Sequence, residues 1–142
     1  MENKIHLQVL TANSTVLDRT VRYVSAPLKD GEAGFLANHA PLLASLKEGV
    51  LTYTFDENEE THDGCIAVSG GVLSISQNEL IVLARSAEPA DSIDLARAQA
   101  AERRARQRLE EHASGLDQKR AEASLHRALA REKACVFLKK QK

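Results

Sequence analysis

The sequence predicts an all-β sandwich over residues 1–87 followed by a C-terminal antiparallel α-helical hairpin over residues 88–142. Three observations support this prediction. Apolar residues alternate with polar ones or form short runs as far as Ala87, helix-forming residues dominate after Glu88-Pro89, and Ser114-Gly115 interrupts the helical segment. Many short strands with no long helical pattern between them indicate an antiparallel sandwich or barrel, and we expect a sandwich.

Turn-forming residues divide the first segment into strands. Ile5, Leu7 and Val9 alternate with polar neighbours as far as Asn13-Ser14, and a second apolar run begins at Val21. Gly70-Gly71 and Gln77-Asn78 are expected to supply turns, because such pairs accept the backbone angles that tight turns need. Beyond the run containing Val21, Tyr23 and Val24, the expected strands are Gly49–Phe55, Cys65–Val68, Val72–Ser76 and Leu80–Ser86.

Ala, Arg, Glu, Gln and Leu dominate the second segment, as is typical of helices. The first helix is expected to begin near Asp91-Ser92, with Asp94 in its first turn, and to end near His112–Gly115. The second should run from about Leu116 or Asp117 to about Leu138, antiparallel to the first. A seam of mostly small side chains buries little area, so the hairpin is a candidate for a part that opens. The expected seam residues are Ala101, Ala105, Leu109, Ala121, Leu125, Ala128 and Leu129.

Composition excludes several classes of protein. A chain of 142 residues has room for a compact domain with an appendage, and it contains no apolar run long enough to cross a bilayer. Residues 1–10 do not resemble a signal peptide, so we expect a cytosolic protein unless a partner holds it at a membrane. Cys65 and Cys135 stand alone in the sequence and are expected to be small apolar fillers.

Charge is distributed unevenly along the chain. Residues 1–90 carry six Lys/Arg against twelve Asp/Glu, a net −6, whereas residues 91–142 carry thirteen against eight, a net +5. A basic segment on an acidic body suggests an anionic partner or ligand, although a solvated helical face is also common. Two Tyr, three Phe and no Trp leave little surface for stacking on single-stranded nucleic acid.

Two arginine rows stand out in the hairpin. At about 100° per residue, Arg97, Arg104 and Arg108 fall within about 40° of one another, with Asp94 about 60° away. Arg120, Arg127 and Arg131 repeat the same spacing on the second helix. Two such rows could converge on one polyanion, because guanidinium groups make forked hydrogen bonds to phosphate oxygens. The alternative from pattern alone is a solvated face, with Glu122 or Glu132 pairing locally.

Two stretches and the helical tail resemble the epsilon subunits of F-type ATP synthases over essentially the whole chain. Residues 31–49 read GEAGFLANHAPLLASLKEG, and residues 68–84 read VSGGVLSISQNELIVLA. The glycine, His-x-Pro-Leu and Ser-Gly-Gly elements follow the order and spacing of that family. Ala37 departs from the family, which usually has Pro there.

The resemblance implies a non-catalytic subunit of the central stalk, peripheral to the cytoplasmic face of the cell membrane. Its sandwich would bind the gamma subunit and the membrane-embedded ring of c subunits, with Glu32 and His39 at interfaces. Without the resemblance, Glu32 would be a solvated turn carboxylate and His39 a hydrogen-bonded loop histidine. The hairpin would lie against the sandwich or extend toward the catalytic beta subunit. The basic residues for that contact would be Arg127, Arg131, Lys133, Lys139 and Lys140.

Residues 93–98, Ile-Asp-Leu-Ala-Arg-Ala, also look like the motif of epsilon subunits that bind ATP. The resemblance implies that Glu88, Asp94, Arg97 and Ala98 surround the base and ribose. It gives the phosphates to Arg104, Arg120, Arg127 and Arg131. The sequence has no phosphate-binding glycine loop and no catalytic or metal-binding cluster, so no cofactor is required and bound ATP would be a regulatory signal.

The resulting hypothesis is a two-state hairpin that ATP holds closed and that inhibits ATP hydrolysis when it extends. A second class is a constitutive structural coupler, whose hairpin neither binds ATP nor inhibits. A third is a nucleic-acid adaptor, which the acidic sandwich and the scarce aromatics argue against. An independent hydrolase lacks a catalytic constellation.

Overall fold

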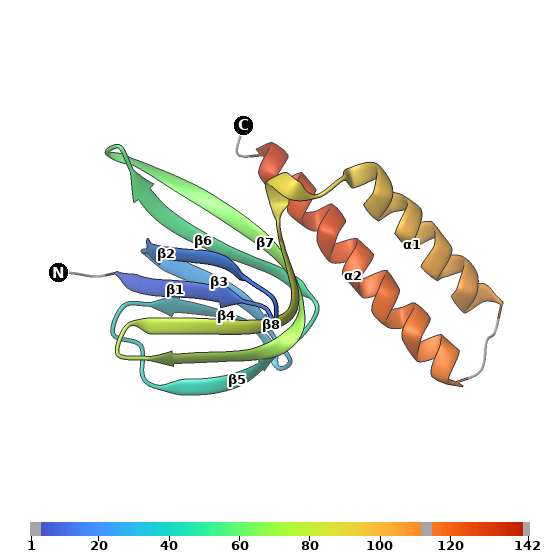
Figure 1. Cartoon of the computed structure of the whole chain (residues 1–142), viewed down its shortest axis with the longest axis horizontal. Helices are drawn as coiled ribbons and strands as arrows, with labels where there is room; N and C mark the ends of the chain where they lie inside the picture. Colours follow the sequence, from blue (N-terminus) through green and yellow to red (C-terminus); the bar gives the residue numbers. More distant parts are fainter. Residues whose placement is uncertain (1–3, 112–114, 141–142) are drawn as a thin grey trace.

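The computed structural model describes residues 4–111 and 115–140, with the backbone alone for residues 115–117 and 138–140. Within these residues a β-sandwich precedes an antiparallel helical hairpin, which confirms the predicted fold class (Figure 1). The strands are β1 (Ile5–Leu10), β2 (Thr15–Val21), β3 (Tyr23–Leu28), β4 (Gly31–Leu36), β5 (Leu42–Leu46), β6 (Gly49–Glu57), β7 (Glu60–Ser76) and β8 (Glu79–Pro89). The 3₁₀ turn η1 (Ala90–Ser92), α1 (Leu95–Glu110) and α2 (Gly115–Lys140) follow.

Two layers arise because β7 and β8 each pass from one layer to the other. Residues 60–68 of β7 pair with β6, which pairs with β3, which in turn pairs with β4. Residues 71–75 of β7 pair instead with β5, and residues 79–83 of β8 pair in parallel with β1, which pairs with β2. The remaining ladders are antiparallel, so the two layers share one long β7–β8 hairpin.

Gly70-Gly71 is not a chain-reversing turn, contrary to the prediction. Both glycines have positive φ, 64° and 125°, yet they lie inside β7 where the strand bends between layers. A Cβ atom on Gly71 would lie 2.1 Å from the carbonyl oxygen of Leu83, so glycine is required for the close approach of β8. The predicted turn at Gln77-Asn78 is confirmed as a two-residue hairpin loop with φ of 50° and 62°.

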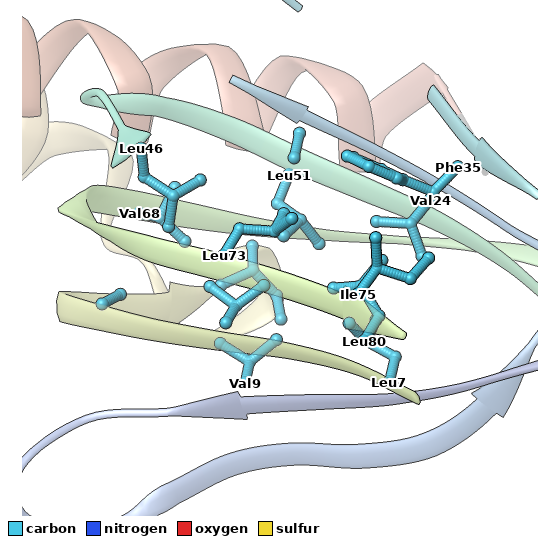
Figure 2. Packing of buried hydrophobic residues seen from close by; sticks show 14 of the residues in the cluster. Leu7, Val9, Val24, Phe35, Leu46, Leu51, Val68, Leu73, Ile75 and Leu80 are labelled. Carbon is cyan, nitrogen blue, oxygen red and sulfur yellow. The ribbon is translucent and has the colours of Figure 1, made fainter. Parts of the chain in front are cut away.

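Alternating apolar residues from both layers form the core (Figure 2). Leu7 and Val9 of β1, Leu73 of β7 and Leu80 of β8 are fully buried, and Phe35 of β4 closes one end. Burying one such side chain contributes about 1.5–3 kcal/mol, so this cluster dominates the stability of the sandwich.

Strands β4 and β5 were not predicted, because their apolar pattern is weak. In β4 Phe35 alone is fully buried, and its two neighbours in the chain are a glycine and an exposed leucine. In β5 Leu42 and Leu43 are exposed and Leu46 is buried, which breaks the alternation that marks a half-buried strand.

The first helix begins later than predicted. Ala90–Ser92 form the 3₁₀ turn, which the Ser92 hydroxyl stabilises by donating to the Pro89 carbonyl (2.8 Å). Asp94 is the N-cap of α1, because its carboxylate accepts a hydrogen bond from the Arg97 backbone N–H (3.2 Å). At the other end α1 stops at Glu110 and Gly115 opens α2, whereas residues 112–114 of the predicted connection lie outside the described residues.

Helix α2 lies between α1 and the sandwich (Figure 1). Ala98 and Ala105 of α1 and Ala121 and Ala128 of α2 are buried, so the hairpin is closed by small side chains as predicted. Leu129 is wrongly assigned to the seam, since it is 38% exposed. A separate apolar cluster joins α2 to β6 and β7 and contains Val50, Cys65, Ala67, Ala90, Ala130 and Ala134. Neither α1 nor α2 has the length and apolar character to cross a membrane.

Candidate functional site

A cavity of about 190 Å³ lies where the sandwich meets the hairpin. Its walls come from the end of β8, from the start of α1 and from α2. Six of the eight residues predicted to bind ATP line it, although they are spread over 44 positions of the chain. They are Glu88, Asp94, Arg97, Ala98, Arg104 and Arg131.

The other two predicted phosphate ligands lie elsewhere. Arg127 lines a smaller hollow that shares Glu88 and Arg131 with the cavity, and its guanidinium donates to the Ser124 hydroxyl (3.1 Å). Arg120 is exposed and lines neither space, because it lies about three helical turns from Arg131 toward the far end of the hairpin. The two arginine rows therefore meet the cavity at one end only.

Arg131 reaches across from α2 to the sandwich. Its Nε donates to Glu88 Oε1 at 2.6 Å, and each side chain of this ion pair is about one-third exposed, 37% for Arg131 and 35% for Glu88. The sequence favoured local pairing of arginines along α2, but this ion pair joins residues 43 positions apart. The hairpin is thus held to β8 by a charge-assisted contact at the floor of the cavity.

The lining suits an anion that also carries hydrogen-bonding groups. Ile93, Ala98 and Ala101 supply apolar surface, and Glu88 and Asp94 supply carboxylates that accept hydrogen bonds from hydroxyl or amino groups. Arg97 and Arg104 stand exposed beside them, so the positive groups of the cavity outnumber the two carboxylates once Arg131 is included. The lining is mostly polar, and its guanidinium groups are of the kind that bind phosphate oxygens.

Glu32 is an exposed strand residue and not a turn carboxylate. It faces Pro27 in the β3–β4 ladder, and its side chain is 57% exposed. Lys133 of α2 lies 4.0 Å from it, and both residues line a mainly apolar groove of about 230 Å³ with Val136 and Phe137. The groove brings together two residues that sequence reasoning assigned to different partners. The side chains of Lys139 and Lys140 lie outside the described part of the chain.

His39 lies in the loop after β4, at the opposite end of that strand from Glu32. Its Nδ1 lies 2.6 Å from the Ala40 carbonyl oxygen, which can only accept, so this nitrogen carries the hydrogen. The ring also contacts Phe35, with 5.0 Å between ring centroids. His39 is therefore a hydrogen-bonded loop histidine, as expected from its residue type.

Sequence reasoning missed an apolar surface on the outer face of the second layer. Val72 and Leu83 are paired across β7 and β8 and are 43% and 47% exposed. Ile81 is 38% exposed and Leu43 is 74% exposed on the same layer. The signal was available, because residues 80–84 are apolar at every position, as in strands covered on both faces. We call Leu43, Val72, Ile81 and Leu83 the outer apolar surface.

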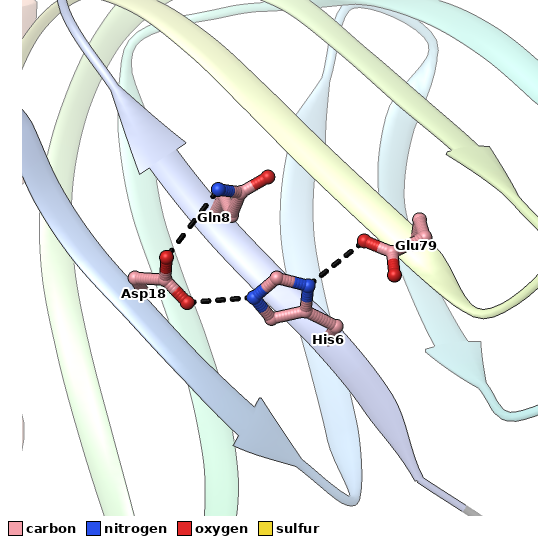
Figure 3. Close-up of polar contacts among 4 residues, drawn as sticks. All are labelled: His6, Gln8, Asp18 and Glu79. Atoms are coloured by element: carbon pink, nitrogen blue, oxygen red, sulfur yellow. Dashed lines mark hydrogen bonds and ion pairs between the residues drawn. The ribbon is translucent and has the colours of Figure 1, made fainter.

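A polar triad lies beside this surface, on β1, β2 and β8 (Figure 3). His6 Nε2 lies 2.6 Å from Asp18 Oδ1, and His6 Nδ1 lies 2.8 Å from Glu79 Oε2. Carboxylates only accept, so the ring donates to both of them when it is doubly protonated and cationic. The hydrogen bonds that His6 donates to Asp18 and then to Glu79 raise the pKa of His6, and the contact with His6 lowers the pKa of Asp18.

Both cysteines are buried, as expected of small apolar fillers, but they share one place in the fold. Cys65 of β7 lies in the cluster beneath α2, and Cys135 of α2 contacts the Ile93 carbonyl at 3.9 Å. Burial raises the pKa of the Cys65 thiol to about 12, with a further rise from Cys135. The Cys65 thiol is therefore almost wholly protonated near neutral pH and reacts slowly while α2 covers it. No cluster of His, Cys, Asp or Glu suited to a metal ion occurs among the described residues.

Comparisons with known proteins agree with this architecture. The family model "ATP synthase, Delta/Epsilon chain, beta-sandwich domain" matches residues 4–90, and "ATP synthase, Delta/Epsilon chain, long alpha-helix domain" matches residues 91–135. Proteins named ATP synthase epsilon chain are 45% identical in Nitratidesulfovibrio vulgaris (92% of this chain, 95% of that protein) and 43% identical in Symbiobacterium thermophilum (93% of each).

A chain in the solved Euglena gracilis mitochondrial ATP synthase, a structure of OSCP, F1 and the c-ring, has the same fold. Its TM-score is 0.79 at 20% identity, and the match covers 94% of this chain and 82% of that one. Two family models together span the sandwich and most of the hairpin, and the bacterial relatives match over nearly their whole length. The chain therefore belongs to the ATP synthase delta/epsilon chain family.

Proposed function

We propose that this chain is a non-catalytic epsilon subunit of the central stalk of an F-type ATP synthase, with a hairpin that senses ATP. The subunit couples rotation to ion translocation at the cytoplasmic face of the membrane. When ATP is bound, the hairpin stays on the sandwich. When ATP is scarce, the hairpin extends toward the catalytic beta subunit and inhibits ATP hydrolysis.

One observation carries this proposal. The cavity is lined by side chains from β8, from the first half of α1 and from α2, among them Glu88, Arg104 and Arg131. These side chains come together only while α2 lies on the sandwich. A ligand that contacts all three elements binds the closed form more tightly than the extended form. It therefore shifts the hairpin toward closure by that difference in affinity.

The outer apolar surface supports the coupling role. Leu43 and Leu83 expose large apolar side chains on the same sheet face as Val72, which is typical of surfaces that another protein covers. We assign the gamma subunit to this surface and the c-ring to the side of β4 that carries Glu32. Replacing Leu83 with Asp should release gamma from the sandwich, whereas the same change at Leu36, an exposed leucine on β4 in the other layer, should not.

Calorimetric titration of the purified subunit with ATP tests the sensing role, and the chain offers a matched pair of arginines. Arg104→Ala removes a guanidinium from the cavity, so affinity should fall about 10- to 100-fold, the range of a charge-assisted hydrogen bond. Arg120→Ala removes the same group from outside the cavity and should leave affinity unchanged. Equal losses in both variants, or no binding by the unaltered subunit up to millimolar ATP, would refute the assigned site.

Deleting the chain from Leu116 onward tests inhibition. The reconstituted enzyme should then hydrolyse ATP faster while the sandwich still assembles with its partners. Unchanged hydrolysis would remove inhibition from the proposal.

A constitutive coupler is the second candidate. The observation in its favour is the Arg131–Glu88 ion pair, because it neutralises one cavity arginine and ties the hairpin to the sandwich without a ligand. This candidate predicts that neither Arg104→Ala nor the hairpin deletion changes the enzyme.

A further inference from the structure

A glutamate side chain that has no part in ATP sensing, that of Glu132, lies in the seam between α1 and α2. Ala121, Leu125 and Ala128 follow one another at helical spacing on the face of α2 toward α1, and the next position in that series is Glu132. Glu132 Oε2 is buried and has no hydrogen-bond donor. A buried carboxylate oxygen without a donor is costly, so its protonation state matters for closure of the hairpin.

Another carboxyl group interacts with Glu132 across the seam. It belongs to Glu102 of α1, whose Oε2 also accepts from Arg106 Nε at 2.8 Å. Two carboxylates without a proton between them would repel each other, whereas one proton lets Glu132 donate to Glu102. Glu102 is the ionised partner, because the hydrogen bond from the Arg106 guanidinium favours its charged form.

The charged groups around the pair support the same assignment. Arg106 and Arg103, both of α1, lie close enough to favour ionisation, but desolvation and Glu102 outweigh them and raise the pKa of Glu132. The pKa of Glu102 is lowered, first by Arg106. On the sandwich side of α2 the adjacent charges are already paired, Arg131 with Glu88 and Lys133 with Glu32.

We propose that Glu102 and Glu132 share one proton in the closed hairpin, so that closure takes up a proton and is weakened as pH rises. This inference goes beyond ATP sensing and does not depend on it. The closed hairpin would then respond to the pH on its side of the membrane as well as to a ligand.

The two pKa shifts determine how the stability of the closed hairpin changes with pH. Glu132 has a folded pKa above its ordinary 4.5, so its contribution to closure is complete below 4.5 and is lost as pH rises through the raised value. Glu102 has a folded pKa below 4.5, so its contribution is present above 4.5 and is lost as pH falls through the lowered value. Closure is therefore most stable between the two, where the pair holds one proton.

Carbon-13 NMR of the side-chain carboxyl groups tests the shared proton in the full-length subunit without nucleotide. The Glu132 carboxyl should titrate above 4.5 and the Glu102 carboxyl below it. Urea unfolding of the hairpin, followed by circular dichroism between about pH 4 and about pH 8, should show closure weakening by up to tenfold per pH unit between 4.5 and the raised Glu132 pKa, with no further weakening above it.

Glu132→Gln supplies a neutral donor to Glu102 at every pH and should abolish this dependence while the hairpin stays closed. Glu122→Gln alters an exposed carboxylate of α2 and should leave the dependence intact. A pH profile that is the same in the unaltered subunit and in Glu132→Gln would overturn the proposal, as would titration of Glu132 below 4.5. ATP affinity enters neither measurement, so this proposal and ATP sensing fail separately.

Discussion

The sandwich core and the hairpin seam are both closed by apolar side chains, but they differ in how much surface each side chain removes from water. Leu7, Phe35 and Leu73 are fully buried in the sandwich, whereas the buried seam residues of α1 and α2 are alanines. At about 25 cal/mol per Å² of buried apolar surface, an alanine seam gains far less per residue than a leucine core. The sandwich is therefore built to stay folded, whereas α1 and α2 are built to separate from each other at modest cost.

Removing core volume should produce the largest effect. Leu7→Ala leaves a cavity between the layers and should lower the free energy of unfolding by about 2–5 kcal/mol. Urea unfolding of the isolated subunit measures the loss. A loss of less than 1 kcal/mol would mean that the sandwich is no better packed than the hairpin and would erase the contrast.

Adding volume to the seam should have an intermediate effect and a different outcome. Ala128→Leu places three carbons where two helices approach closely and should weaken closure by about 1–3 kcal/mol. The hairpin should open while the melting of the sandwich stays unchanged, as separate NMR signals from α2 and β1 would reveal. Leu129→Ala, at the exposed neighbouring position, is the control and should change neither. Simultaneous loss of both regions would show that they fold as one unit.

A histidine on the sandwich surface should produce the smallest effect. The raised pKa of His6 means that its stabilising contribution is complete below 6.5 and is lost as pH rises through the raised value. Because the side chain is 37% exposed, solvent screens the triad, and the change should be about 0.5 kcal/mol. His6→Gln should flatten the dependence of sandwich unfolding on pH above 6.5. If the pH dependence of unfolding were the same in His6→Gln, the triad would not contribute to the stability of the sandwich.

The fold class was readable from the sequence because its signals are local. Alternation in β1 and the two-residue turn at Gln77-Asn78 follow from side-chain period and backbone angles. Gly70-Gly71 misled, because positive φ serves a strand bend as well as a turn, and the choice depends on the layer that β7 joins next. Strand β5 was not predicted because Leu42 and Leu43 are adjacent and both exposed, so its apolar residues do not alternate with polar ones.

For the candidate site, the sequence predicted residue types better than contacts. Spacing placed Arg97 and Arg104 on one stripe, and both line the cavity. The same spacing argument placed Arg120 in a row with Arg127 and Arg131, but α2 runs away from the sandwich and Arg120 lies outside the cavity. The Arg131–Glu88 pair and the Glu102–Glu132 pair depend on how helices pack, which helical periodicity alone does not specify.

Accessibility of the Cys65 thiol tests most directly whether the hairpin opens and whether ATP holds it closed. Cys65 is 6% exposed beneath α2, and its raised pKa keeps it unreactive until α2 moves away. In a Cys135→Ala variant, which leaves one thiol, labelling should be measurably faster than global unfolding of the sandwich and should slow as ATP saturates the cavity. Labelling at one rate with and without ATP, or no faster than global unfolding, would contradict a ligand-controlled hairpin.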